Sequence, residues 1–115
     1  MTTQEIYQLA INEGIKHDLR GEDYVRQSLI KAKKKYEEMN DKEKAGFDSE
    51  SLSNPYSDSR VLFSDGAKPV KKILAGIDIE SPELLYAKQQ GDIDLVIAHH
   101  PEGLALADLS TVMHL

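Results

Sequence analysis

The pattern across residues 70–101 constrains the fold of this chain more than any other feature. An apolar run, Val70–Ile79, with its strand expected around Ile73–Ile77, comes before Ser81-Pro82-Glu83, and a second apolar run, Ile93–Ala98, follows. Neither run alternates regularly with polar residues, which indicates strands buried on both faces. Strand, helix and strand within about 30 residues form a βαβ unit, so we expect two parallel strands joined by a right-handed crossover.

The helix between these strands has well-defined ends in the sequence. Ser81 is expected as the N-cap, Pro82 at the first helical position and Glu83 in the first turn, where an acid favours the positive end of the helix dipole. Gly91 is expected to end the helix at the C′ position. The residues expected on its buried side are Leu84, Leu85 and Ala87.

The first 45 residues predict a helical hairpin. Thr2 and Glu5 have the spacing of a capping box at the start of the first helix. Gly14 and Gly21 bracket an expected break before the second helix. The apolar stripe expected on the first helix consists of Ile6, Leu9 and Ala10.

The second helix is expected to begin at Glu22 and to end near Asn40–Gly46. Its lysine-rich stretch, residues 31–35, fits either a partner-binding patch or a solvated helix face. We favour the solvated face, because no aromatic residues interleave with the lysines. The apolar positions that follow helical spacing are Val25, Leu29, Ala32, Tyr36 and Met39.

Beyond this hairpin, residues 46–59 are rich in turn-forming residues and predict a connection, and Arg60–Phe63 predicts a short strand. Residues 104–115 have apolar positions near helical spacing and no stop signal, so we expect the natural protein to continue. The predicted fold class is α/β: an N-terminal helical hairpin (1–45), then a part (46–115) whose sheet contains the parallel βαβ unit. We expect one domain that is the incomplete N-terminal part of a larger fold.

Composition excludes several kinds of site. The sequence has no cysteine, which rules out disulfides, thiolate metal sites and cysteine catalysis. It has no run of about 18 apolar residues, as a membrane-spanning helix needs, and no secretory signal pattern, so we expect a cytoplasmic protein without a membrane partner. The net charge of −6 lies entirely in residues 45–115. This argues for a cation as ligand and against a nucleic-acid partner.

Two adjacent histidines, His99 and His100, close the second apolar run just before Pro101. The carboxyl ends of parallel strands meet at one sheet edge, where α/β folds place ligands, so Asp78 is expected on the same edge. Imidazole nitrogen binds divalent transition metals well. Neighbouring strand side chains point to opposite faces, so the pair is better suited to two ions than to chelating one. The alternative is structural: the rings cap the strand, and Asp78 is only a turn residue.

The segments KKILAGIDI, a helix started by Ser-Pro, and GDIDLVIAHHP together resemble the Nif-three-like (NGG-one-interacting-factor-three) family, often labelled type-two GTP cyclohydrolase-I-like. The resemblance covers roughly Val70–Pro101. It departs from the family pattern at Glu102, where an apolar residue is usual, and in the absence of tryptophan. It implies a dinuclear metal site in which His99 and His100 are ligands, with the remaining ligands beyond Leu115, and a homo-oligomer, a hexamer in the family.

The expected function is that of a dinuclear-metal-binding protein of hydrolase type, of which this chain is a fragment with a partial site. The expected cofactors are two divalent metal ions, such as zinc or iron, and a bridging water would act as the nucleophile. The small-molecule substrate is unidentified, and no residue stands out as a general acid or base. The alternative is a non-enzymatic metal-binding module with a regulatory or interaction role.

Overall fold

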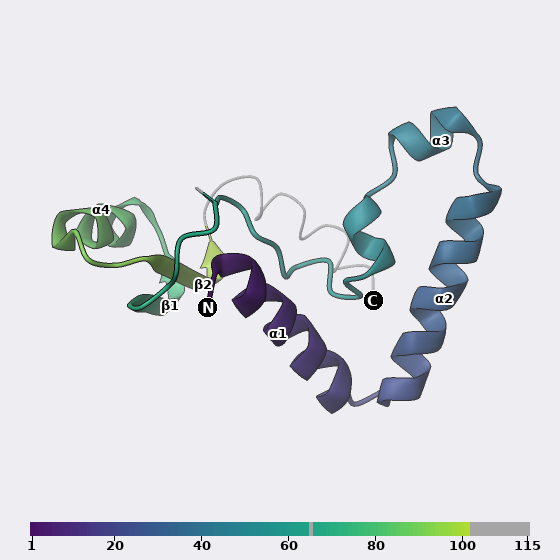
Figure 1. The fold of residues 1–115 in the computed structure, drawn as a ribbon, viewed down its shortest axis with the longest axis horizontal. Coiled ribbons are helices and arrows are strands. Elements are labelled where there is room, and N and C mark those ends of the chain that lie inside the picture. The colour runs from purple at the N-terminus through teal and green to yellow at the C-terminus, as the bar shows by residue number, and fades with distance from the viewer. Residues whose placement is uncertain (65, 102–115) are drawn as a thin grey trace. The chain divides into compact units, whose positions relative to one another are not determined.

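The computed structural model describes residues 1–64 and 66–101 of the chain (Figure 1). The helix predicted over residues 104–115, and with it His114, lies outside the described residues. The elements, in chain order, are α1 (Thr3–His17), α2 (Glu22–Glu38), α3 (Asp41–Ala45), the 3₁₀ helix η1 (Ser49–Leu52), β1 (Ile73–Ile79), α4 (Ser81–Gln90) and β2 (Leu95–Pro101). Helices followed by a parallel βαβ unit confirm the predicted α/β class. No described helix combines the length and the apolar character needed to cross a membrane.

The chain divides into two compact units. One unit is Gln8–Ser59, and the other joins Met1–Tyr7 to the chain from Arg60 onward. The boundary at Ser59 falls at the end of the turn-rich connection, whereas the sequence analysis placed the division at residue 45. The N-terminus joins the second unit through an isolated antiparallel bridge between Thr2 and Pro69 and a 2.7 Å hydrogen bond from Val70 N to Met1 O.

In the Gln8–Ser59 unit, α1 continues through Gly14 and ends at His17, and α2 begins at Glu22, so the break falls between Gly14 and Gly21, as predicted. A Cβ atom at residue 14 would lie 2.9 Å from Cε2 of Tyr56. Glycine therefore makes room for the Tyr56 ring against α1, and the chain leaves the helix only after His17. The predicted capping box at the start of α1 is confirmed, with Thr2 N donating to Glu5 Oε2 and Glu5 N to Thr2 Oγ1.

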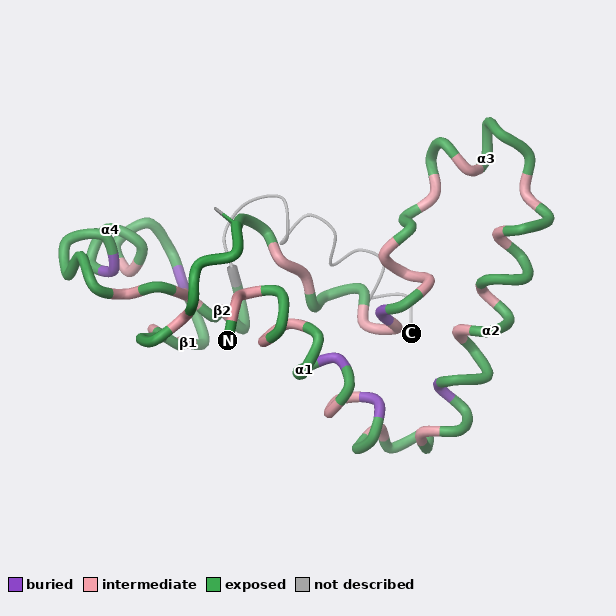
Figure 2. The backbone as a smooth tube through the Cα atoms, viewed as in Figure 1, coloured by how far each residue is buried: buried purple, intermediate pink, exposed green. Residues whose placement is uncertain are grey.

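The buried face of α1 differs from the prediction. Ile11 and Ile15 are the buried residues of α1, whereas Leu9 and Ala10 of the predicted stripe are exposed (Figure 2). Ile11, Gly14, Ile15 and Asp18 follow the i, i+3, i+4, i+7 spacing of one helix face. Tyr56 contacts this face at Gly14 and Asp18. The contact with Tyr56, not the density of apolar residues, decides which face is buried.

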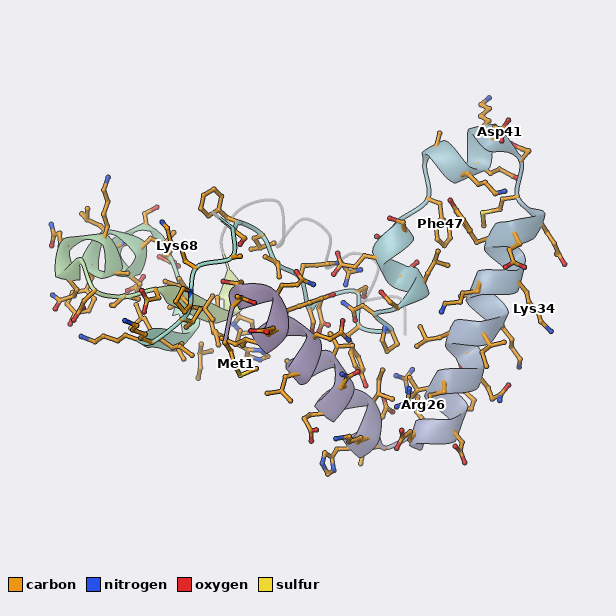
Figure 3. The ribbon with its side chains drawn as sticks, in the orientation of Figure 1. Met1, Arg26, Lys34, Asp41, Phe47 and Lys68 are labelled. Carbon is orange, nitrogen blue, oxygen red and sulfur yellow. The ribbon has the colours of Figure 1, made fainter. Side chains whose placement is uncertain are left out.

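The apolar stripe of α2 was predicted correctly. Val25 is fully buried, and the other four positions of the stripe are half-buried. The helices follow one another through a short connection, but α2 makes more of its contacts with η1 than with α1. Phe47 projects from the segment between α3 and η1 toward α2, and its ring centroid lies 5.0 Å from that of Tyr36 (Figure 3). On the opposite side of α2, Lys34 points outward, as expected of a solvated face (Figure 3).

After α2, the chain forms a second, short helix before the helical region ends. α2 stops at Glu38, and Asn40 begins the short α3 with a capping box. Glu43 N donates to Asn40 Oδ1 over 3.0 Å, and Asn40 N donates to Glu43 Oε2 over 2.9 Å. The Asn40 side chain accepts from a backbone N–H that would otherwise have no partner at the start of α3. This favours two helices here over one longer helix.

In the second unit, β1 and β2 pair in parallel, as predicted. Ile73 lies opposite Leu95, Gly76 opposite Ala98 and Asp78 opposite His100. The start of the pair is held by a side chain: Asp94 Oδ2 accepts hydrogen bonds from Lys71 N at 2.8 Å and Lys72 N at 2.9 Å. Arg60–Phe63 is not a strand, contrary to the prediction. No described strand pairs with it, and a short extended run without a ladder partner gains little.

The two strands are not buried on both faces, which corrects another expectation. Ile73, Ile77 and Ile97 are all exposed. The described sheet has only two strands, and α4 is the helix that packs against β1. One helix covers one face of a sheet, so the other face stays uncovered. Continuous apolar runs are typical of strands between two helical layers, and the described part supplies one such layer.

α4 begins one residue earlier than predicted, with Glu80 instead of Ser81 as its N-cap. Glu80 and Glu83 form a capping box, in which Glu80 N donates to Glu83 Oε2 over 3.0 Å. Gly91 ends the helix in the left-handed region, with φ 73°, as the sequence predicted. Of the three residues expected on the buried side, Ala87 is buried, whereas Leu84 and Leu85 are exposed.

Candidate metal centre

The candidate site lies at the carboxyl ends of β1 and β2. The ladder places Asp78 of β1 directly opposite His100 of β2. Nδ1 of His100 lies 2.9 Å from Oδ1 of Asp78. The expectation that parallel pairing brings Asp78 to the edge with the histidines is therefore confirmed, and the two side chains are in direct contact.

The two histidine rings lie side by side. The centroids of His99 and His100 are 4.5 Å apart, and the ring planes are inclined by only 23°. In an ideal strand, consecutive side chains point to opposite faces. Here the two rings are stacked against one another instead, and both residues are exposed. The objection to a shared ligand position, which rested on ideal alternation, does not apply to this strand end.

The contact between Asp78 and His100 fixes the proton of the neutral imidazole. An ionised carboxylate can only accept hydrogen bonds, so Nδ1 of His100 must carry the hydrogen. The lone pair of the neutral ring then lies on Nε2. A histidine that donates one N–H to a carboxylate and keeps the other nitrogen free is a common arrangement for metal-ligating histidines.

The side chains at the candidate site are of a type that binds transition metals, but the described residues include fewer of them than a metal site needs. Imidazole nitrogens are good ligands for zinc and iron, whereas Mg²⁺ and Ca²⁺ prefer oxygen. Within residues 1–64 and 66–101, no three His, Asp or Glu side chains are grouped so that they could hold an ion. His17 lies on α1 in the Gln8–Ser59 unit, where its Nε2 is 3.6 Å from Glu13. Among the described residues, the candidate site therefore has two imidazoles, His99 and His100, which are fewer donors than a metal site needs.

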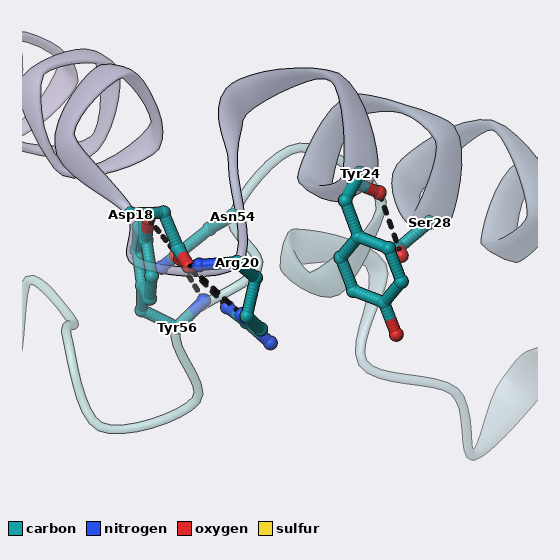
Figure 4. A network of polar contacts seen from close by, with 6 residues as sticks. All are labelled: Asp18, Arg20, Tyr24, Ser28, Asn54 and Tyr56. Carbon is teal, nitrogen blue, oxygen red and sulfur yellow. Dashed lines mark hydrogen bonds and ion pairs between the residues drawn. The ribbon is translucent and has the colours of Figure 1, made fainter.

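Sequence reasoning missed a second polar cluster, in the Gln8–Ser59 unit (Figure 4). Asp18 Oδ1 accepts from Arg20 Nε at 2.9 Å, and Asp18 Oδ2 accepts from Arg20 Nη2 at 2.8 Å and from the Tyr56 hydroxyl at 3.1 Å. The buried Asn54 accepts from Tyr56 N at 2.8 Å and donates to Ser59 O at 2.7 Å. No signal in the sequence links Asp18 to Tyr56, because 38 residues separate them.

The pKa shifts of Asp18 and Tyr56 indicate that this cluster has a structural role. Hydrogen bonds from Arg20 hold the pKa of Asp18 well below its usual range, and Tyr56 adds a smaller contribution. Burial, together with the hydrogen bond to Asp18, raises the pKa of the Tyr56 hydroxyl. A carboxylate kept ionised and a phenol kept neutral form a stable donor–acceptor pair. The cluster ties the end of α1 to residues 54–59.

Comparison with known proteins adds no assignment. No family model matches the chain, and the searches of curated proteins and of solved structures found no significant match. The resemblance to the Nif-three-like family stays a prediction from the sequence. The function proposed next depends on the residues at the strand ends and on that resemblance.

Proposed function

We propose that this chain belongs to a dinuclear-metal-binding protein of hydrolase type, in which His99 and His100 are metal ligands. The observation that supports this most is the pair of exposed imidazoles, stacked 4.5 Å apart at the end of a parallel strand. Two neutral nitrogen donors at one position, with a carboxylate holding one ring, suit zinc or iron better than a purely structural cap.

The contribution of this chain to such a site is to hold and orient nitrogen donors. Bound divalent ions would supply the activation of a water molecule for hydrolysis. The strand pairing places the donors at a solvent-accessible sheet edge, where a small-molecule substrate could reach them. As in the sequence analysis, the substrate class is unassigned, and we propose a homo-oligomer in the cytoplasm as the setting.

Metal content tests the proposal. Elemental mass spectrometry would be applied to the natural protein as the cell makes it, to the His99→Ala/His100→Ala variant and to His17→Ala. Two ions per chain, lost in the double variant and retained in the variant of the exposed His17, would support the proposal. Wild-type protein without stoichiometric metal would overturn it.

Turnover then separates the two classes of function that share these ligands. Metal-dependent hydrolysis of nucleotides or phosphoesters, abolished in the double variant, would support the hydrolase. Metal that raises thermal stability without turnover of any substrate tried would support the non-enzymatic module instead.

A further inference from the structure

We propose that Asp78 is a positioning residue, whose carboxylate holds the Nδ1–H of His100 so that Nε2 of this ring is the metal-binding nitrogen. The inference rests on the proposed function, because it states how the chain orients one of the two ligands. It concerns a residue of a different strand, and it predicts a property of the metal-free chain that can be measured separately.

The backbone places the two groups together. Asp78 and His100 are partners in the β1–β2 ladder, and partners in a parallel ladder project on the same side of the sheet. The next residue of β1, Ile79, is 5% exposed and anchors the strand end in the core. The 2.9 Å contact therefore joins positions that hydrogen-bonded backbone and a buried anchor already hold close.

The neighbouring ring restricts His100 further. The stacked ring of His99 lies against one face of the His100 imidazole. With one face covered, the ring is held in its plane by His99, and a 180° rotation about its Cβ–Cγ bond would break the hydrogen bond to Asp78. Nε2 is left as the nitrogen with a free lone pair. His99 has no comparable carboxylate partner among the described residues and serves as an internal comparison.

A plain surface ion pair is the competing explanation. The side chains of His100 and Asp78 are 53% and 73% exposed, and exposed pairs contribute little to stability. Such a pair would leave the ring proton and the metal affinity largely independent of Asp78. A matched pair elsewhere in the same unit is Lys72 with Asp92, whose charged atoms are 2.7 Å apart at similar exposure. Asp92→Ala is therefore the control for loss of one surface carboxylate.

The first experiment determines the tautomer of the His100 imidazole in the absence of metal. Long-range ¹H–¹⁵N NMR spectra of the histidine rings would be recorded for the metal-free chain at about pH 8, above the ordinary titration range of a histidine side chain. We expect the Nδ1–H form at His100 in the wild type and in Asp92→Ala, with a shift toward the Nε2–H form in Asp78→Ala. An unchanged His100 tautomer in Asp78→Ala would overturn the inference.

The second experiment is a Zn²⁺ titration of the natural protein, stripped of its metal, and of the same variants made in it. Asp78→Ala is expected to weaken binding about 10- to 100-fold, as loss of such a partner does elsewhere. Asp78→Asn, which keeps an acceptor oxygen, is expected to recover part of the affinity, which a direct carboxylate ligand would not allow. Asp92→Ala should bind like the wild type.

The outcomes separate the two proposals. Zn²⁺ binding that depends on His99 and His100 but is equal in wild type and Asp78→Ala would overturn the role of Asp78 and leave the proposed function standing. Absence of Zn²⁺ binding at these histidines in the wild type, alongside a tautomer that still responds to Asp78, would overturn the proposed function. The carboxylate would then orient the ring without serving a metal.

Discussion

At the scale of single residues, Asp18 shows how one side chain can join distant parts of a small unit. Its two carboxylate oxygens accept hydrogen bonds from Arg20, two residues further along the chain, and from Tyr56, 38 residues further along. The Tyr56 ring in turn covers Gly14. Because α1 has only two buried isoleucines, this polar anchor helps to determine how the helix packs.

Replacing Asp18 by asparagine is expected to reduce the acid sensitivity of the fold. Hydrogen bonds from Arg20 lower the pKa of Asp18 in the folded chain, so the folded state binds fewer protons at this group than the unfolded state does. Its stabilisation is complete above about pH 4, the ordinary range of an aspartate, and is lost as pH falls further. Urea midpoints between pH 5 and pH 2 should fall less steeply in Asp18→Asn.

The control for this prediction is Asp58→Asn, which removes an exposed carboxylate from the same unit. It should keep the pH dependence of the wild type. If Asp18→Asn loses stability with acid as steeply as the wild type does, the cluster around Asp18 is not a source of acid sensitivity.

At the scale of elements, α1 shows how tertiary contact overrides helix propensity. Glycine inside a helix costs about 1 kcal/mol relative to alanine, so propensity alone predicts that Gly14→Ala stabilises the chain. A Cβ atom there would meet the Tyr56 ring at 2.9 Å, and that ring is held by Asp18. Overpacking of this kind costs about 1–3 kcal/mol.

Gly14→Ala is therefore expected to lower the free energy of unfolding by up to about 2 kcal/mol, the overpacking cost less the propensity gain, measured by urea denaturation. Gly46→Ala is the control, because the nearest atom to its added Cβ would be Glu43 O at 4.0 Å. That change should be close to neutral. A stabilised Gly14→Ala variant would show that Tyr56 does not pack against α1.

At the scale of the whole molecule, the isoleucines of the sheet are part of the core only where other residues pack over them. Ile77 and Ile79 are two residues apart in β1, so strand alternation assigns them to the same face. Ile77 is nevertheless 65% exposed and Ile79 only 5% exposed. The Ile79 side chain occupies the space beside Gly76, where a Cβ atom would lie 2.7 Å from its Cδ1 atom.

The same substitution at these two positions should have different effects. Ile79→Ala is expected to cost about 2–5 kcal/mol of stability, as deletion of a buried isoleucine does. Ile77→Ala should change stability by less than about 0.5 kcal/mol, as an exposed substitution does. Chemical denaturation of both variants measures the difference. Equal losses would mean that Ile77 is buried as well as Ile79.

The features that depend on short spacings could be predicted from the amino-acid sequence. It predicted the capping box at Thr2, the helix end at Gly91, the apolar stripe of α2 and the parallel pairing of β1 with β2. It also predicted the shared edge of Asp78 and the histidines, because parallel strands carry their carboxyl ends to one side. Each of these follows from the chemistry of residues within one element or one βαβ unit.

Tertiary packing sets which of the candidate surfaces are buried and which side chains contact one another. The buried face of α1 depends on Tyr56, and the stacking of His99 on His100 depends on how the strand departs from ideal alternation. Burial on both faces of the strands was predicted wrongly, because an apolar run does not reveal how many layers cover a sheet. Contacts between residues far apart in the chain are set by packing, which local spacing does not encode.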